Sequence, residues 1–137
     1  MRAIIRATLA AEGARAGEIG IRLTDDAELR ALNRQWRGID RATDVLSFPY
    51  SGEDDGRVSG DLVISMDRAV AQARRYRVSV GRELARLTIH GTLHLAGHDH
   101  HQPGERVRMR RAEARAMRAA RAGILALDAA WSRTLTS

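Results

Sequence analysis

The sequence predicts an α+β fold, a small mixed sheet of about three to four strands packed with several helices. Three observations support this prediction. Apolar residues recur with the helical period in some segments and alternate in others. Residues 87–96 carry no formal charge, as in a helix that is buried around most of its circumference. A chain of 137 residues is long enough for one domain, 1–137, with one core.

The first elements follow from periodicity and from one helix start signal. Residues 2–14 have helical composition, and apolar residues alternate along 19–23 as in a half-buried strand. Asp25 and Glu28 have the spacing of a capping box, which predicts a helix that ends near Gly38. The apolar face of that helix consists of Leu29, Leu32 and Trp36.

Two further strands are predicted on either side of an acidic stretch. Residues 45–48 form the first, which Pro49 stops, and the continuous apolar run 62–64 indicates a strand covered on both faces. We expect the two strands to pair. Residues 51–60 are predicted to be a mobile, acidic surface loop. The polar residues of these strands are expected to cap or hold loops rather than to act as catalysts; they are Asp44, Ser47 and Asp61.

Three helices are predicted in the second half of the chain. Asp67 is expected to cap a short helix that runs to Arg75, and Ser79 a longer one that runs to Ala96. The third spans 104–122 and carries one apolar stripe, made by Met109, Ala112, Ala116 and Ala120.

Composition limits the class of function. All 23 basic residues are arginines, and 17 acidic residues leave a formal net charge of +6. This sign favours a polyanionic partner such as nucleic acid. The absence of lysine carries no weight, because a GC-rich coding sequence produces it too. The five aromatic residues are too few for a base-stacking platform and are expected in the core.

The chain shows no sign of export or of membrane insertion. No window approaches the ~20 apolar residues of a membrane span, and Arg6 and Glu12 interrupt the only apolar stretch near the amino terminus. We therefore expect a soluble, cytoplasmic protein without membrane contact. Because there is no cysteine, a bound metal must be held by His, Asp or Glu.

All five histidines lie within residues 90–101. His90 and His94 are four residues apart, which places them on one helix face about 6 Å apart along the axis, where two imidazoles can bind one ion. Burying neutral imidazoles without partners costs a few kcal/mol, whereas a metal satisfies both. The alternative is a pair of core histidines that are hydrogen-bonded to the backbone.

A third ligand is available because the chain turns back after this helix. Gly97 can adopt the left-handed conformation that ends a helix. If the following chain is extended, His98 and His100 point to one side and Asp99 and His101 to the other. Three neutral ligands would leave the full positive charge of the ion and one open coordination position.

The histidine spacing also resembles that of zinc proteases, in which a Glu general base follows the first histidine. Here that position is Gly91. A peptidase built in this way would lack its base, which argues against proteolysis.

Three stretches together resemble one known family. His90-Gly91-Thr92-Leu93-His94-Leu95-Ala96-Gly97-His98-Asp99-His100 is similar to the signature H-G-x-L-H-L-x-G-[YH]-D-H of the YbeY proteins, bacterial metal-dependent endoribonucleases of ribosomal RNA maturation. The stretches 32–49 and 60–65 agree with the same family, so the resemblance covers about 19–113. It implies hydrolysis of phosphodiester bonds in single-stranded RNA, processing of the 3′ end of 16S ribosomal RNA, and ribosome quality control.

The resemblance also implies the site. It selects His90, His94 and His100 as ligands of one zinc ion per chain. His100 lies two positions further from the turn than His98, which adds about 6 to 7 Å of reach and agrees with this choice. Arg37 and His90 become the candidate catalytic residues, with Arg37 offsetting charge on the scissile phosphate. No residue is assigned as general base.

The resemblance implies partners as well. These are ribosomal RNA, the small ribosomal subunit, ribosomal proteins and a ribosome-associated GTPase. The arginine-rich helix 104–122 is a solvated face by default, but its position after the histidine motif makes it a candidate RNA surface. The candidate RNA-binding residues are Arg37, Arg108, Arg111 and Arg115.

The sequence departs from the family at three points. His98 stands where many relatives have Tyr, and Ala42 where Pro is usual. The resemblance leads us to expect a strand before the first helix, whereas the sequence begins at that helix, so whether this strand and the sheet edge it would form are missing is left open. The alternative function is a non-catalytic, zinc-stabilised ribosome assembly or RNA-binding factor, whose structural site would need a fourth ligand from His98 or His101.

Overall fold

A computed structural model describes residues 1–50, 56–98 and 102–136 of the chain. It confirms the α+β class. The elements follow in the order α1 Arg2–Ala11, β1 Ala16–Thr24, α2 Asp26–Arg37, β2 Val45–Pro49, β3 Val58–Ser65, α3 Met66–Tyr76, α4 Val80–Leu95, α5 Pro103–Ala119 and α6 Arg121–Thr136. None of the helices in this part of the chain is long and apolar enough to cross a membrane.

The described strands form one mixed sheet with the order β1-β3-β2. β3 lies in the centre, parallel to β1 and antiparallel to β2. Its residues Leu62, Val63 and Ile64 are buried, which confirms the strand covered on both faces. Leu62 pairs with Ile21 on one side and with Ser47 on the other, so these three side chains lie on the same face of the sheet. Successive residues of each strand alternate between the two faces.

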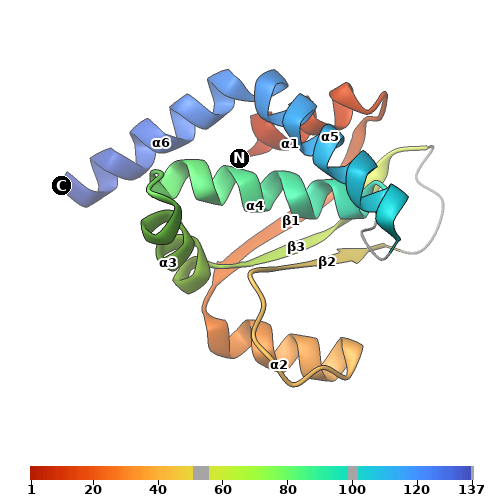
Figure 1. Cartoon of the computed structure of the whole chain (residues 1–137), viewed down its shortest axis with the longest axis horizontal. Coiled ribbons are helices and arrows are strands. Elements are labelled where there is room, and N and C mark those ends of the chain that lie inside the picture. The colour runs from red at the N-terminus through yellow and green to blue at the C-terminus, as the bar shows by residue number, and fades with distance from the viewer. Residues whose placement is uncertain (51–55, 99–101, 137) are drawn as a thin grey trace.

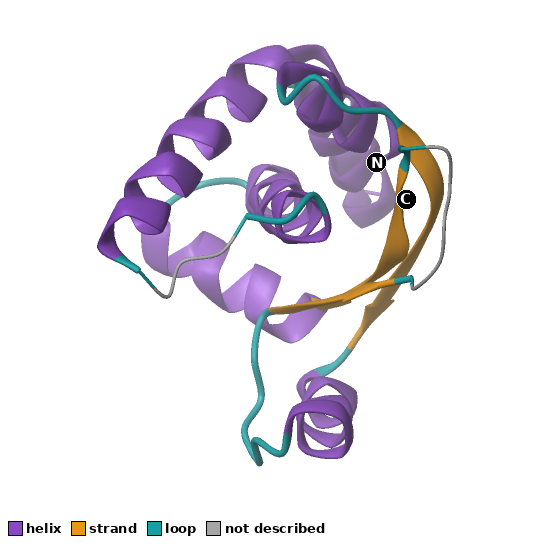
Figure 2. Cartoon of the chain, turned by 90° about the vertical axis from the view of Figure 1, so that its right-hand side faces the viewer, coloured by secondary structure: helices purple, strands orange, loops and turns teal. Residues whose placement is uncertain are grey.

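Helix α4 is the centre of the molecule. It contacts β2 and β3 of the sheet and four other helices, α1, α3, α5 and α6. Figure 2 shows it end-on, inside a ring made by those helices and the sheet, while α2 lies on the opposite face of the sheet (Figure 1). The side chains of Leu84, Leu87, Ile89 and Leu93 are at most 1% exposed, which confirms the predicted burial around the helix.

Two predicted helix starts differ in detail from the structure. Asp25 caps α2 by accepting a hydrogen bond from the Glu28 amide at 2.9 Å, as predicted. The reciprocal half of the capping box is absent among the described contacts, because the Glu28 carboxylate instead accepts from Thr24 and Arg22. The cap of α3 is Ser65 rather than Asp67, since its hydroxyl accepts from the Arg68 amide.

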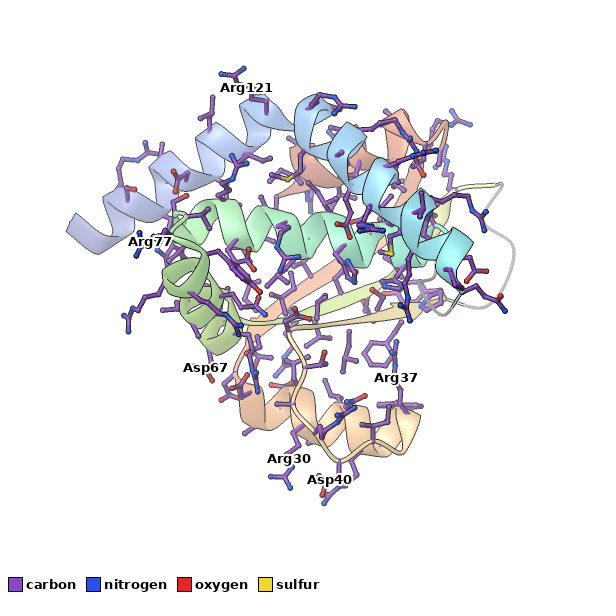
Figure 3. All side chains as sticks on the ribbon, viewed as in Figure 1. Arg30, Arg37, Asp40, Asp67, Arg77 and Arg121 are labelled. Carbon is purple, nitrogen blue, oxygen red and sulfur yellow. The ribbon has the colours of Figure 1, made fainter. Side chains whose placement is uncertain are left out.

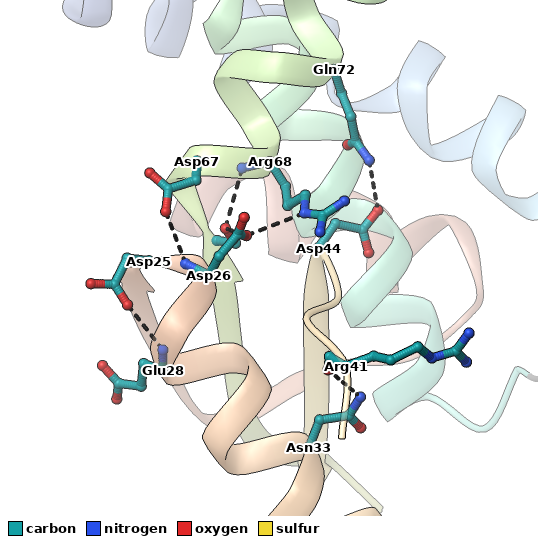
Figure 4. A network of polar contacts seen from close by, with 10 residues as sticks. Asp25, Asp26, Glu28, Asn33, Arg41, Asp44, Asp67, Arg68 and Gln72 are labelled. Carbon is teal, nitrogen blue, oxygen red and sulfur yellow. Dashed lines mark hydrogen bonds and ion pairs between the residues drawn. The ribbon is translucent and has the colours of Figure 1, made fainter. Parts of the chain in front are cut away.

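Asp67 helps to hold α2 in place instead. Its carboxylate accepts a hydrogen bond from the Asp26 amide at 2.9 Å, and the Asp26 carboxylate accepts from Ser65 and Arg68 (Figure 4). At the other end of α2, the Asn33 side chain donates to the carbonyl of Arg41. α2 ends at Gly38, near which its end was predicted, and Gly38 has the left-handed conformation. These contacts fix the position of α2, and therefore of Arg37 in its last turn.

Three further expectations need correction. Residues 58–60 belong to β3 rather than to the acidic loop, because they continue the pairing with β1 and β2; residues 51–55 lie outside the described part. The helix predicted to run to 122 ends at Ala119, and a further helix, α6, follows. The aromatic residues are not all core residues, since Trp36, Tyr50 and Tyr76 are 65%, 47% and 54% exposed.

Candidate metal centre and active site

His90 and His94 lie side by side on α4, as their spacing predicts. Their Nε2 atoms are 3.1 Å apart, and their rings meet edge to face. Both side chains are partly exposed, whereas the residues that flank them on the helix are buried. The pair therefore faces outward from a helix whose other residues between 87 and 95 are buried.

A carboxylate of α5 holds the His90 ring. Oε1 of Glu113 lies 2.6 Å from Nδ1 of His90, and both side chains are about three-quarters buried, with exposures of 24% and 26%. A carboxylate accepts hydrogen bonds and does not donate them, so this contact favours the tautomer with its proton on Nδ1. The lone pair is then on Nε2, the atom that faces His94.

This geometry fits a bound metal ion. Metal-binding histidines almost always donate their second ring nitrogen to a carboxylate, a carbonyl or water, which is what His90 does with Glu113. Two nitrogens bound tetrahedrally to one zinc ion, at about 2.0 to 2.1 Å each, lie about 3.3 Å apart, close to the 3.1 Å found here. The nitrogen donors also suit zinc and other transition metals better than magnesium or calcium.

The third predicted ligand, His100, lies outside the described residues, as does His101. No group of three or more metal-binding side chains is found within the ranges that the structure describes. His98, the rival of His100, is described. Its Nε2 contacts Oε1 of Glu12, at the end of α1, and Glu12 also pairs with Arg115 at 3.1 Å.

Gly97 has φ +100°, so the predicted left-handed turn after α4 is confirmed. Backbone hydrogen bonds close this turn, from the Gly97 amide to the His94 carbonyl and from the His98 amide to the Leu93 carbonyl. The turn and the Glu12 contact together fix where His98 lies.

The position where a zinc protease has its general base has no room for a side chain. A Cβ on Gly91 would lie 2.9 Å from Leu62 and 3.1 Å from Val45, both on the strands beneath α4. Ser47 of β2 donates a hydrogen bond from its hydroxyl to the Gly91 carbonyl at 2.9 Å. Glycine at this position therefore lets α4 lie close against the sheet, and a larger residue here, such as the Glu of the zinc proteases, would force neighbouring side chains to shift.

A cleft of about 810 Å³ brings Arg37 together with the histidines. Its lining includes Arg37, Ser47, His90, His94 and His98, so residues from α2, β2 and α4 meet in one place. Arg37 extends from the last turn of α2 toward the sheet (Figure 3), and its Nη2 donates to the Ser47 carbonyl at 3.4 Å. The Arg37 side chain is exposed, so a ligand can reach its guanidinium.

The three arginines predicted on α5 share one stripe of that helix at spacings of three and four residues, and all are exposed. Arg108 and His98 line a small hollow of about 230 Å³. Arg115 pairs with Glu12, which offsets part of its charge. The described contacts do not connect Arg111 with the cleft.

Sequence reasoning missed Glu113 and Glu12, and it expected Ser47 to hold a loop, whereas Ser47 ties β2 to α4. Glu113 is 23 residues from His90 and on another helix, and Glu12 is 86 residues from His98. Spacing along the chain carries no signal for such contacts. Asp44 and Asp61 bind Gln72 and Tyr50, which agrees with the holding roles expected of them.

Comparison with known proteins gives consistent matches. A family model described as Endoribonuclease YbeY matches residues 1–121. Proteins named Endoribonuclease YbeY from Anaeromyxobacter sp. and Chloroflexus aurantiacus are each 51% identical, over 120 and 117 residues. The matches cover 87% and 78% of this chain, but 62% and 76% of those relatives, so the chain spans less than two thirds of the Anaeromyxobacter protein.

A solved structure is also similar. The solution structure of TM1509 from Thermotoga maritima matches with a TM-score of 0.52 and 27% identity. The match covers 89% of this chain and 81% of that one.

Proposed function

Because the chain belongs to the YbeY endoribonuclease family, we propose that it is a metal-dependent endoribonuclease that hydrolyses phosphodiester bonds in single-stranded ribosomal RNA. The observation that carries the proposal is the convergence of His90 and His94, with Nε2 atoms 3.1 Å apart, in a cleft that Arg37 also lines. By family resemblance the substrate is the 3′ end of 16S ribosomal RNA, with a further role in ribosome quality control. Such a substrate implies a cytoplasmic location and the small ribosomal subunit as a partner.

His90, His94 and, as we propose, His100 would hold the metal, which we take to be zinc. When bound, the ion supplies Lewis-acid stabilisation of phosphoryl charge and lowers the pKa of water. Glu113 fixes the orientation and tautomer of His90, which keeps Nε2 available as a donor. The Ser47 hydroxyl ties α4 to β2, so the histidines keep their position relative to that strand.

Arg37 would act on the RNA itself. Its guanidinium can give two parallel hydrogen bonds to a phosphate, and it would stabilise the negative charge that grows there in the transition state. Its carbonyl contact at 3.4 Å is long, so moving to a phosphate costs little. We assign no general base and leave the nucleophile open.

The test is cleavage of total ribosomal RNA by the purified protein, with and without a chelator, with the new RNA ends mapped by sequencing. We expect defined ends that chelator abolishes and that added zinc or another divalent ion restores. His94→Ala should abolish them too. Cleavage that survives both the chelator and His94→Ala would depend on neither the metal nor the proposed site, and would refute the proposal.

The second candidate is a non-catalytic assembly factor with a structural metal, which the net charge of +6 supports equally. Such a site needs four protein ligands. His98, one of the two residues that could supply the fourth, is engaged by Glu12, which favours the enzyme. The assembly factor would be favoured if the protein binds RNA but does not cleave it with any divalent ion tested, and if X-ray absorption spectroscopy shows four protein ligands to the metal.

A further inference from the structure

A second cavity lies on the other face of the sheet. It has a volume of about 680 Å³ and is formed between α2 and the sheet face that α2 covers. We call it the aromatic groove and define it by the residues Leu32, Trp36, Phe48, Pro49, Tyr50 and Asp61. The register explains why these side chains meet: Phe48 of β2 pairs with Asp61 of β3, and Asp61 pairs with Gly20 of β1, on the same face.

The groove presents aromatic rings to solvent. Trp36 is 65% exposed and Tyr50 47% exposed, although burying a large aromatic side chain is strongly favourable. Trp36 and Phe48 meet edge to face, with centroids 6.4 Å apart. Tyr50 is held by a hydrogen bond from its hydroxyl to Asp61 at 2.7 Å. This bond raises the pKa of Tyr50.

The groove adjoins the histidine cleft. Trp36 lines the groove and the next residue, Arg37, lines the cleft, while Pro49 lines both. β2, which carries Phe48 and Pro49, is an edge strand of the sheet that the described residues form. A ligand chain can therefore pass from the histidines, over Arg37, around the edge of the sheet and into the groove.

We propose that the aromatic groove binds unpaired bases of the RNA strand whose phosphate lies at Arg37. The inference rests on the proposed function and adds the part of the substrate that is recognised beside the scissile bond. Aromatic rings next to a cationic group are the usual means of holding single-stranded RNA, because every base has a face that stacks. Bases within a duplex are already stacked, so the groove selects single strands.

Stacking on Trp36 can be observed directly through indole fluorescence. The chain has two tryptophans, so Trp131→Phe leaves Trp36 as the only indole and Trp36→Phe leaves Trp131. The probe is a single-stranded 2′-O-methyl oligonucleotide, checked on a gel to remain intact during the titration. We expect saturable quenching in Trp131→Phe and none in Trp36→Phe. A duplex of the same sequence and an abasic ribose-phosphate oligomer should leave Trp36 unquenched.

Binding affinity provides the second measurement. Trp36→Ala should raise the dissociation constant about tenfold, within the range that stacking of one base on an aromatic ring provides. The matched control is Tyr76→Ala on α3, an aromatic residue of similar exposure that does not line the groove; its dissociation constant should be unchanged.

Absence of Trp36 quenching together with an unchanged dissociation constant of Trp36→Ala would overturn the proposal that the groove binds bases. Equal quenching by the abasic oligomer would overturn it too. Saturable quenching by an apolar peptide but not by the oligonucleotide would also overturn it, in favour of a protein partner. The same preparations are assayed for chelator-sensitive cleavage. If cleavage persists while quenching is absent, only the groove is wrong; if cleavage is absent, the proposed function itself fails.

Discussion

The Glu113 carboxylate lies 2.6 Å from Nδ1 of His90, which joins α5 to the histidine face of α4. The contact connects two helices that come from different parts of the chain. It gives His90 the tautomer that a metal ligand needs, and it does so through a residue that no motif identified.

Glu113→Gln should therefore weaken metal binding while preserving the fold. An amide keeps the shape of the carboxylate but polarises the imidazole less, and loss of such an outer contact costs about 10- to 100-fold in affinity. Competition with a fluorescent chelator measures the dissociation constant. Glu105→Gln, the same change on the same helix, is the control and should leave metal affinity unaltered. Equal affinity of Glu113→Gln and the native chain would contradict the role of Glu113.

The third ligand is tested by three alanine variants. His100→Ala should lower metal affinity by orders of magnitude, because a three-histidine site loses one of its donors. His98→Ala and His101→Ala should keep the ion; for His98 the contact with Glu12 supports this expectation. Metal titration of the three variants measures their dissociation constants and shows which histidine is the third ligand. If His98→Ala loses the metal and His100→Ala keeps it, the family assignment of the third ligand does not carry over to this chain.

Arg37→Ala should slow cleavage and leave stability nearly unchanged. We expect a loss of about 2 to 4 kcal/mol of transition-state stabilisation, measured as kcat/KM on a model RNA. The side chain is exposed, so the melting temperature should shift by no more than about 2 °C. Arg34→Ala is the matched control, since Arg34 is an exposed arginine in the same helical turn and does not line the cleft. Wild-type rates in Arg37→Ala, or an unfolded variant, would refute the assignment.

Gly91→Ala should destabilise the protein although alanine is the better helix former. The propensity gain is about 1 kcal/mol, but the new methyl group would lie 2.9 Å from the side chain of Leu62, which is fully buried, so the packing around it must shift. Overpacking of this kind costs about 1 to 3 kcal/mol, so the net effect is a loss. Urea denaturation measures it. Gly104→Ala on α5, where the nearest atom is 3.6 Å away in a flexible arginine, should be neutral or stabilising. A stabilised Gly91→Ala would show that α4 and the sheet separate easily.

Predictability from the sequence differed between the kinds of contact. The helix faces, the central strand 62–64, the caps Asp25 and Ser79, and the turn at Gly97 all follow from signals within a few residues, and the structure confirms them. The Asp67 cap was wrong because Ser65, two residues earlier, competes for the same role, and only the position of α2 gives Asp67 another donor. The prediction that the aromatic residues lie in the core was wrong for a similar reason. Hydrophobicity predicts burial, but whether a ring such as Trp36 finds a covering surface depends on the neighbouring elements.

The sequence by itself determined that His90 and His94 share a face, because the helical repeat places residues four apart side by side. It also determined that no acid follows His90, since Gly91 is read directly. Only the tertiary structure decided that Glu113 fixes the His90 ring, that Glu12 engages His98, and that Arg37 lines the same cleft as the histidines. The physical reason is the separation along the chain. Periodicity relates residues a few positions apart, whereas these contacts join residues that are 23 or 86 positions apart or lie on separate elements. Packing of α4 against the sheet and the neighbouring helices brings them together.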